Sequence, residues 1–260
     1  METQTSPVPL FLERLRLRSA LTADEQRAIL GLAGERQRYR AHTDIVSPGE
    51  HVDSACLVSE GLVARFDQML DGERQITSFY IPGDMCDLHS VVAPKASWSI
   101  TALSPATVIH IAHRQLRELC LAYPAIALAF WRDGTVDASL FAKWVGNLGR
   151  KDAKARIAHI MCEMGMRMEA AGLGSRTGYD LPATQQQLAD AAGLTPVHVN
   201  RTLQDIRAQG LLTFVNQRVE IRSWERLAEV AEFDPGYLML DEPPHRVAPI
   251  PATRQHAPAH

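Results

Sequence analysis

The 260-residue sequence contains no apolar run long enough to cross a membrane and no recognisable export signal. Its longest apolar stretch, residues 119–131, is interrupted by Pro124 and is shorter than the roughly 18 residues that a membrane-spanning helix needs. The segment from Met1 to Glu13 holds no early basic residue and only one short apolar cluster, so it does not form a secretory signal. We therefore predict a cytoplasmic protein with no membrane partner.

Closely spaced cysteines are also missing. Cys56, Cys86, Cys120 and Cys162 are widely separated along the chain, whereas structural zinc sites use closely spaced pairs and small secreted domains use dense disulfides. We expect four reduced, mostly buried thiols and no metal site.

The chain has no excess of positive charge. It holds 27 basic and 30 acidic residues, a formal net charge of -3, so the case for a nucleic-acid partner must rest on a local site. With 46% hydrophobic and 22% charged residues the chain can bury a sizeable core, which excludes a disordered polymer. Its length suits one large domain or two modest ones.

A regular series of turn signals is present between residues 48 and 105. The glycines of this segment recur at an almost constant spacing and are Gly49, Gly61, Gly72 and Gly83. Strands punctuated in this way are typical of a β-barrel or β-sandwich, and residues 62–67 alternate as a strand does. We predict a β domain from about Tyr39 to Ala112, preceded by a short helix at residues 23–32.

After the β domain the turn signals stop. Residues 125–149 lack proline and are rich in helix formers, which predicts one long helix. Its apolar stripe is interrupted by Asp133 and Asp137 and consists of Ile126, Phe130, Leu140, Phe141, Trp144 and Leu148. The stripe fits either a dimer seam or a helix that packs on its own β domain. A second helix is expected over residues 152–171, with Gly172 at its C-terminal cap.

The clearest local signal is a pair of capped helices separated by a tight turn. Thr184 opens a capping box, and Gly193 stops the helix that follows. Thr195 is the N-cap of the next helix and Pro196 occupies its first position, where a missing N–H costs nothing. The pattern predicts a helix-turn-helix over residues 184–210.

Side chains suited to DNA follow the same pattern. Arginine binds guanine through two hydrogen bonds, asparagine and glutamine bind adenine, and valine contacts the thymine methyl group, while helix N-termini bind phosphates. We predict DNA contacts from Thr184, Gln185, Thr195, Val197, His198, Asn200, Arg201 and Gln204. Strand patterns at residues 212–215 and 218–221 flank Asn216 and Gln217 and predict the wing of a winged helix.

This order of elements resembles the Crp/Fnr family of transcription regulators. The matches are Pro82-Gly83-Asp84, residues 181–193 and 195–203 as the two helices of the DNA-binding motif, and Arg201 at the family's base-reading position. Val197 stands where the family often has a glutamate that reads cytosine, which puts the usual half-site preference there in doubt. The resemblance implies a homodimer on a palindromic site in double-stranded DNA, with RNA polymerase as a further partner.

The resemblance also implies an α+β fold in four parts. These are a β-roll (jelly roll) like a cyclic-nucleotide-binding domain at residues 10–115, a long dimerisation helix at 116–149, a winged helix-turn-helix at 150–232, and a mostly disordered tail at 233–260. Proline and histidine are frequent from Asp241 to His260.

The known signals of the family fit this chain poorly. Its cyclic-nucleotide binders carry an Arg-Ser pair for the phosphate, where this chain has Ala96-Ser97, and a buried phosphate without a cation is costly. Its iron–sulfur members use an N-terminal cysteine run, whereas the first cysteine here is Cys56. Its carbon-monoxide sensors bind haem through a cysteine and a histidine, which Cys86 and His89 resemble with the cysteine displaced by one position.

Two functions from different classes stay open. The leading hypothesis is a sequence-specific DNA-binding regulator whose effector is not cAMP. The alternative is a sensor of haem or a small molecule, with ligation near Cys86 and His89 and with Ser97 as a third effector-binding candidate. The cofactor is left unknown. The sequence shows no nucleophile elbow, P-loop or zinc-hydrolase motif, so we predict no enzyme.

Overall fold

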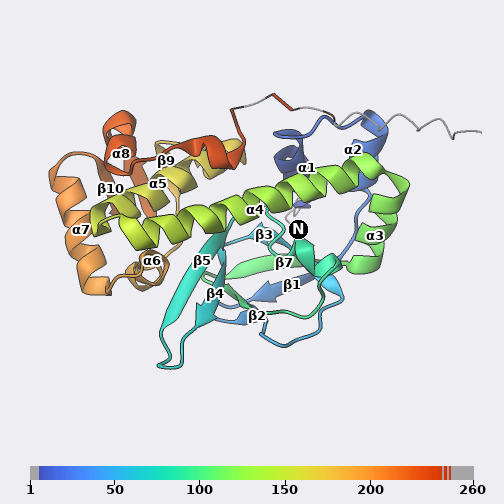
Figure 1. The fold of residues 1–260 in the computed structure, drawn as a ribbon, viewed down its shortest axis with the longest axis horizontal. Helices are drawn as coiled ribbons and strands as arrows, with labels where there is room; N and C mark the ends of the chain where they lie inside the picture. Colours follow the sequence, from blue (N-terminus) through green and yellow to red (C-terminus); the bar gives the residue numbers. More distant parts are fainter. Residues whose placement is uncertain (1–5, 242, 245, 247–260) are drawn as a thin grey trace, which may run out of the picture.

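The computed structural model describes residues 6–241, 243–244 and 246. It contains a β-roll and a C-terminal DNA-binding-like domain, connected by a long helix that runs across the molecule (Figure 1). In the described part of the chain no helix combines the length and the apolar composition that a membrane crossing requires. The four cysteines are free, and three of them are buried, as expected.

The β-roll consists of two antiparallel sheets. One has the order β1-β7-β3 and the other β2-β6-β4-β5. The strands are β1 (Glu35–Tyr39), β2 (Asp44–Val46), β3 (Ser54–Glu60), β4 (Val63–Gln68), β5 (Arg74–Tyr80), β6 (Ser99–Ala102) and β7 (Ala106–Ala112). The predicted β domain is confirmed, although it begins at Glu35 rather than Tyr39. A short 3-10 helix, η1 (Leu88–Val91), follows the Pro82-Gly83-Asp84 turn.

Strand β4 alternates as predicted, yet both of its faces are buried. Val63 packs inside the β-roll, whereas Ala64 and Phe66 join a core shared with the C-terminal domain. Each face of this strand therefore packs against a different core of the same chain.

Four helices flank the β-roll: α1 (Val8–Arg16), α2 (Ala23–Leu30), α3 (His113–Ala122) and α4 (Pro124–Arg150). The prediction of one helix over residues 116–149 is wrong at its start, because the helical backbone is interrupted at Tyr123. Proline disfavours helical backbone at the residue before it, and Tyr123 has φ -132° and ψ 86°. The long helix therefore starts at Pro124.

Helix α1 was not predicted from the sequence. Its N-cap residue, Pro7, has no side-chain cap, and Ser6, one residue earlier, accepts from the Val8 N–H over 3.3 Å, so the start signal is weaker than a capping box. Its residues Phe11 and Leu15 are buried against α4, where the rings of Phe11 and Phe130 lie 5.7 Å apart. Tertiary packing, not a local signal, makes this segment a helix.

The apolar stripe of α4 faces its own chain. Ile126, Phe130, Leu140 and Trp144 are all buried within one protomer. Of the two interpretations of this stripe, packing on the same chain is correct for these four residues, and they do not form a dimer seam.

The C-terminal domain confirms the predicted winged helix-turn-helix. Its helices are α5 (Ala153–Ala170), α6 (Gln185–Ala192), α7 (Pro196–Ala208) and α8 (Trp224–Val230). Its sheet has the order β10-β11-β9-β8, with β8 (Gly174–Ser175), β9 (Gly178–Asp180), β10 (Leu212–Val215) and β11 (Arg218–Ile221). The first helix of the motif starts at Gln185 rather than at residue 181, because Thr184 is its N-cap.

The segment after α8 is ordered, which corrects the prediction of a tail from residue 233. It contains η2 (Pro235–Leu238), and Leu238 is fully buried against Val136, Leu140 and Met166. The Tyr237 hydroxyl donates to Glu163 Oε2 over 2.9 Å. This C-terminal segment ties the DNA-binding-like domain to α4. The predicted disorder of residues 242, 245 and 247–260 concerns positions outside the described residues.

Candidate nucleic-acid interface

Local hydrogen bonds fix where α6 begins and ends. The Thr184 hydroxyl accepts from the Gln187 amide N–H over 3.2 Å, and the Gln187 side chain accepts from the Thr184 N–H over 2.8 Å. Gly193 ends the helix with φ +61°, a left-handed conformation that glycine adopts without strain. Both signals are read directly from the sequence, which explains why the prediction of this helix holds.

Helix α7 buries one face and exposes the other. Its N-cap Thr195 accepts from the His198 N–H over 3.3 Å, and Val199 and Ile206 are fully buried in the domain core. On the opposite side Val197 is 62% exposed, and the other exposed side chains are His198, Arg201 and Gln204. The structure thus brings the predicted DNA-facing residues onto one surface.

Arg201 is available on this surface. In the part of the chain that the structure describes, no side chain forms an ion pair or a hydrogen bond with it. The nearby Asp205 instead pairs with Lys154 of α5, whose ammonium lies 2.5 Å from Asp205 Oδ2. The only acid on the exposed part of α7 is therefore neutralised by another helix, and it leaves the guanidinium of Arg201 free for a ligand.

Asn200 joins the two helices of the motif. Its Nδ2 donates to Gln185 Oε1 of α6 over 3.1 Å, and its Oδ1 accepts from Gln204 Nε2 of α7 over 3.0 Å. Asn200 itself is half-buried, whereas Gln185 and Gln204 are exposed. The three amides form a continuous chain across the surface.

The wing has the predicted two-residue turn. Asn216 and Gln217 have φ +50° and +63°, the left-handed pair of a hairpin turn that matches the twist of its strands. Leu212 pairs with Ile221 and Val215 with Arg218 across it. The hairpin lies beside the helix-turn-helix, as in a winged helix.

A second surface lies on α4, opposite the face that its own chain covers. Trp131, Ala138 and Val145 recur with a heptad spacing and are exposed, Trp131 by 74% and Val145 by 71%. Between residues 131 and 149 the exposed positions carry no charge: all four charged residues there are buried or half-buried. A side chain added at Gly134, Gly146 or Gly149 would meet no atom within 4 Å. This face of α4 is therefore not covered by the described residues, carries no exposed charge and has apolar side chains at a heptad spacing.

Of the three effector-binding candidates, Ser97 lines a pocket, whereas Cys86 and His89 do not belong to its walls. Cys86 is fully buried in the β-roll core, where burial raises the pKa of its thiol well above the ordinary value. His89 is half-buried with its ring 4.7 Å from that of Trp98, and burial lowers its pKa to about 4. A haem iron needs a thiolate or an accessible imidazole, so this pair fits poorly. In the described residues no three metal-ligating side chains gather.

Ser97 lines a pocket between the β-roll and α4. The pocket has a volume of about 460 Å³ and its walls include Arg65, Trp98, Phe141 and Trp144. The Arg65 guanidinium donates to the Cys86 carbonyl over 2.7 Å and lies 4.4 Å from the Trp98 ring and 4.7 Å from the Phe141 ring. Arg65 was not predicted from the sequence, because only the fold brings β4 and α4 together.

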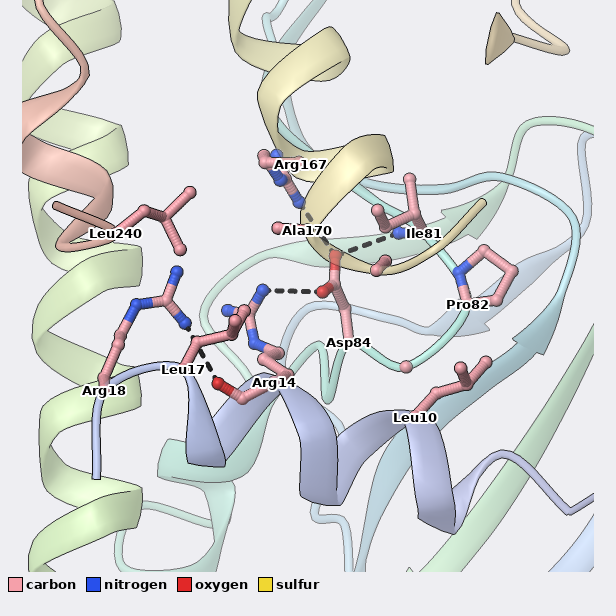
Figure 2. A pocket seen from close by; sticks show the side chains of 12 residues that line it. Leu10, Arg14, Leu17, Arg18, Ile81, Pro82, Asp84, Arg167, Ala170 and Leu240 are labelled. Carbon is pink, nitrogen blue, oxygen red and sulfur yellow. Dashed lines mark hydrogen bonds and ion pairs between the residues drawn. The ribbon is translucent and has the colours of Figure 1, made fainter. Parts of the chain in front are cut away.

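A buried ionic cluster holds the β-roll and the C-terminal domain together (Figure 2). Asp84, in the turn after β5, accepts from Arg14 of α1 over 2.6 Å and from Arg167 of α5 over 2.8 Å. Burial alone would raise the pKa of Asp84, but the two guanidinium groups outweigh it and lower the pKa. Arg14 also contacts Asp133 of α4 over 2.8 Å. The turn that marks the family resemblance therefore has a structural role here.

Comparison with known proteins identifies both domains. The family model described as "Cyclic nucleotide-binding domain" matches residues 36–123, and the one described as "Crp-like helix-turn-helix domain" matches residues 155–230. These matches fall on the β-roll and on the winged helix.

Relatives extend across both domains. The chain is 24% identical to the transcriptional activator protein FnrL of Cereibacter sphaeroides over 75% of this chain and 80% of that protein. It is 24% identical to the nitrogen fixation regulation protein FixK of Azorhizobium caulinodans over 73% and 76%. The solved structure of FixK2 from Bradyrhizobium japonicum superimposes with a TM-score of 0.69, at 26% identity, over 76% of this chain and 98% of that one.

Proposed function

Because the chain belongs to the Crp/Fnr family of transcription regulators, we propose that it binds a palindromic DNA site as a homodimer. Each protomer places α7 in the major groove of one half-site. The observation that carries this proposal is the division of α7 into a buried apolar face and an exposed face with Val197, Arg201 and Gln204.

Each exposed residue has a role that follows from its chemistry. The unpaired guanidinium of Arg201 suits guanine O6 and N7, and Val197 suits a thymine methyl group rather than the cytosine that a glutamate would read. Thr184, Gln185 and Thr195 lie at helix N-termini, where backbone N–H groups favour phosphates. His198 lies in the first turn of α7, so we assign it to the same phosphate contacts.

The homodimer is supported by the exposed face of α4. An uncharged stripe with a heptad repeat is typical of helices that pair, and the three glycines leave room for a close approach of a second helix. We assign the seam to Trp131, Ala138 and Val145. RNA polymerase remains an expected further partner on family grounds.

Charge gives a second reason for a dimer. Residues 184–222 hold only four basic residues against three acidic ones, whereas affinity for DNA depends largely on neutralised phosphates. A single copy therefore has little electrostatic attraction to DNA. Two linked copies double the number of contacts and raise the affinity through their effective concentration.

We place effector binding, where it occurs, in the pocket lined by Ser97, Trp98 and Phe141. A cyclic nucleotide is disfavoured, since the nearby cation, Arg65, already binds the Cys86 carbonyl and packs between two rings. The buried thiol of Cys86 gives the haem alternative no support. Quenching of tryptophan fluorescence by candidate ligands tests this site, and quenching that is unchanged both in Trp98→Phe and in Trp144→Phe excludes it, because these are the two tryptophans of the pocket wall.

The DNA function is tested by selection from a random DNA pool, followed by binding measurements on the selected site. Arg201→Ala should cost about 1–3 kcal/mol and remove the preference at one base pair. Arg207→Ala is a matched control, because Arg207 is exposed in the last turn of the same helix, whereas base contacts come from the N-terminal part of such a helix. If the wild-type protein selects no sequence, or if Arg201→Ala leaves the selected sequence and affinity unchanged, the proposal is wrong.

A further inference from the structure

We propose that Asn200 is a positioning residue which orients Gln204, and that Gln204 reads adenine. This inference rests on the proposed DNA function and assigns a specificity-determining role within it. It starts from the chain of three amides that runs from Gln185 through Asn200 to Gln204.

Asn200 has fewer free groups for base reading than Gln204. A bidentate contact with adenine requires an amide oxygen that accepts from N6 and an amide nitrogen that donates to N7. In Asn200 both atoms are already engaged, since the oxygen accepts from Gln204 and the nitrogen donates to Gln185, whereas in Gln204 only the nitrogen is engaged and the oxygen is free. Its side chain is also half-buried, whereas that of Gln204, one helical turn further along, is exposed. Gln204 is therefore the better placed reader.

Gln185 determines which amide donates and which accepts in each of the two hydrogen bonds. Gln185 is the first residue of α6, where a phosphate is expected, and phosphate oxygens only accept hydrogen bonds. Gln185 must then turn its Nε2 donor outward and its Oε1 toward Asn200. This orientation fixes the Asn200 amide, which in turn makes Gln204 donate inward through one hydrogen of Nε2.

The groups that Gln204 retains match one base. Its free Oε1 accepts, and the second hydrogen on its Nε2 donates. Adenine offers the complementary N6 donor and N7 acceptor, while cytosine offers only a donor and guanine and thymine offer acceptor oxygens. Adenine alone satisfies both groups, and an unsatisfied polar group in a desolvated interface is unfavourable.

The test compares the full-length protein with Asn200→Ala, Gln204→Ala and the double variant on operators that carry every single base change. The wild type should prefer adenine at one base pair by about 5- to 150-fold. Both single variants should lose this preference at the same base pair. The double variant should be no worse than Gln204→Ala, because the two residues act in series.

Two further variants extend the test. Gln204→Glu keeps the acceptor and loses the donor, so it should shift the preference at that base pair from adenine to cytosine. Gln185→Ala should weaken binding to all sequences through the lost phosphate contact, and it should also reduce the adenine preference, because the Asn200 amide loses the group that orients it. Thermal unfolding of each variant checks that the domain is folded.

The possible failures are distinguishable. If Asn200→Ala removes the preference at a base pair that Gln204→Ala leaves intact, Asn200 itself reads DNA and the inference is overturned while the DNA function stands. If Gln204→Ala changes no base preference, the inference is likewise overturned and the DNA function stands. If the wild-type protein selects no sequence, both the inference and the proposed function fail.

Discussion

Replacement of Trp131 by alanine should separate the proposed dimer into monomers without unfolding them. A buried tryptophan covers about 150–250 Å², so the 74% of Trp131 that is exposed corresponds to roughly 110–185 Å². At about 25 cal/mol per Å², covering this area contributes about 3–4.5 kcal/mol for each protomer. Part of that gain offsets the cost of association. We therefore expect the dissociation constant of the dimer to rise at least 100-fold, about 2.7 kcal/mol.

Sedimentation equilibrium over a concentration series measures this constant directly. The matched control is Val92→Ala, a side chain that is 84% exposed in the turn after η1 and is not part of the proposed seam. Thermal unfolding of Trp131→Ala should remain a single cooperative transition, with a lower midpoint than that of Val92→Ala because association stabilises the folded state. A wild-type protein that is monomeric at high concentration, or a Trp131→Ala variant with an unchanged dissociation constant, would refute the assignment of the seam to this face.

Three further predictions concern stability. Leu238→Ala should lower the free energy of unfolding by about 2–5 kcal/mol, because the side chain is fully buried; urea unfolding with no loss above about 1 kcal/mol would show that the C-terminal segment is not docked. Asp84→Ala should cost about 3–5 kcal/mol by the same measurement, since it leaves two buried guanidinium groups without their shared carboxylate, and exposed Asp71→Ala should cost almost nothing. Burial lowers the pKa of His159 to about 3, whereas the unfolded chain takes up this proton below about pH 6.5. Stability should therefore fall as the pH falls from about 6.5 to about 3, by up to about 1.4 kcal/mol per pH unit from this residue. An unchanged slope in His159→Gln would contradict this account.

Features set by neighbouring residues could be predicted from the sequence. The capping box at Thr184, the left-handed Gly193 and the turn at Asn216-Gln217 each depend on atoms within a few positions of one another. Such contacts leave a pattern in the sequence. The helix-turn-helix and the wing were accordingly placed with almost correct bounds.

Features set by distant residues could not be predicted in this way. Arg14 meets Asp84 and Asp133 across 70 and 119 positions of sequence, and nothing local marks these three as partners. Asp133 and Asp137 looked like interruptions of an apolar stripe, but both contact Arg14. The residues after α8 looked disordered from their prolines, yet Pro235 starts η2 and Leu238 fills a gap between α4 and α5.

Helix α4 shows why the more apolar of two stripes need not be the one that pairs in the proposed dimer. The stripe with the larger apolar residues, such as Leu140 and Trp144, gains more from burial and is taken by the chain's own core. The stripe that remains for a partner is weaker, with Ala138 between Trp131 and Val145, but it is free of charge and close to glycines. Substitutions on the two stripes should therefore differ in kind: Leu140→Ala lowers the stability of each protomer, whereas Trp131→Ala changes only the association of two.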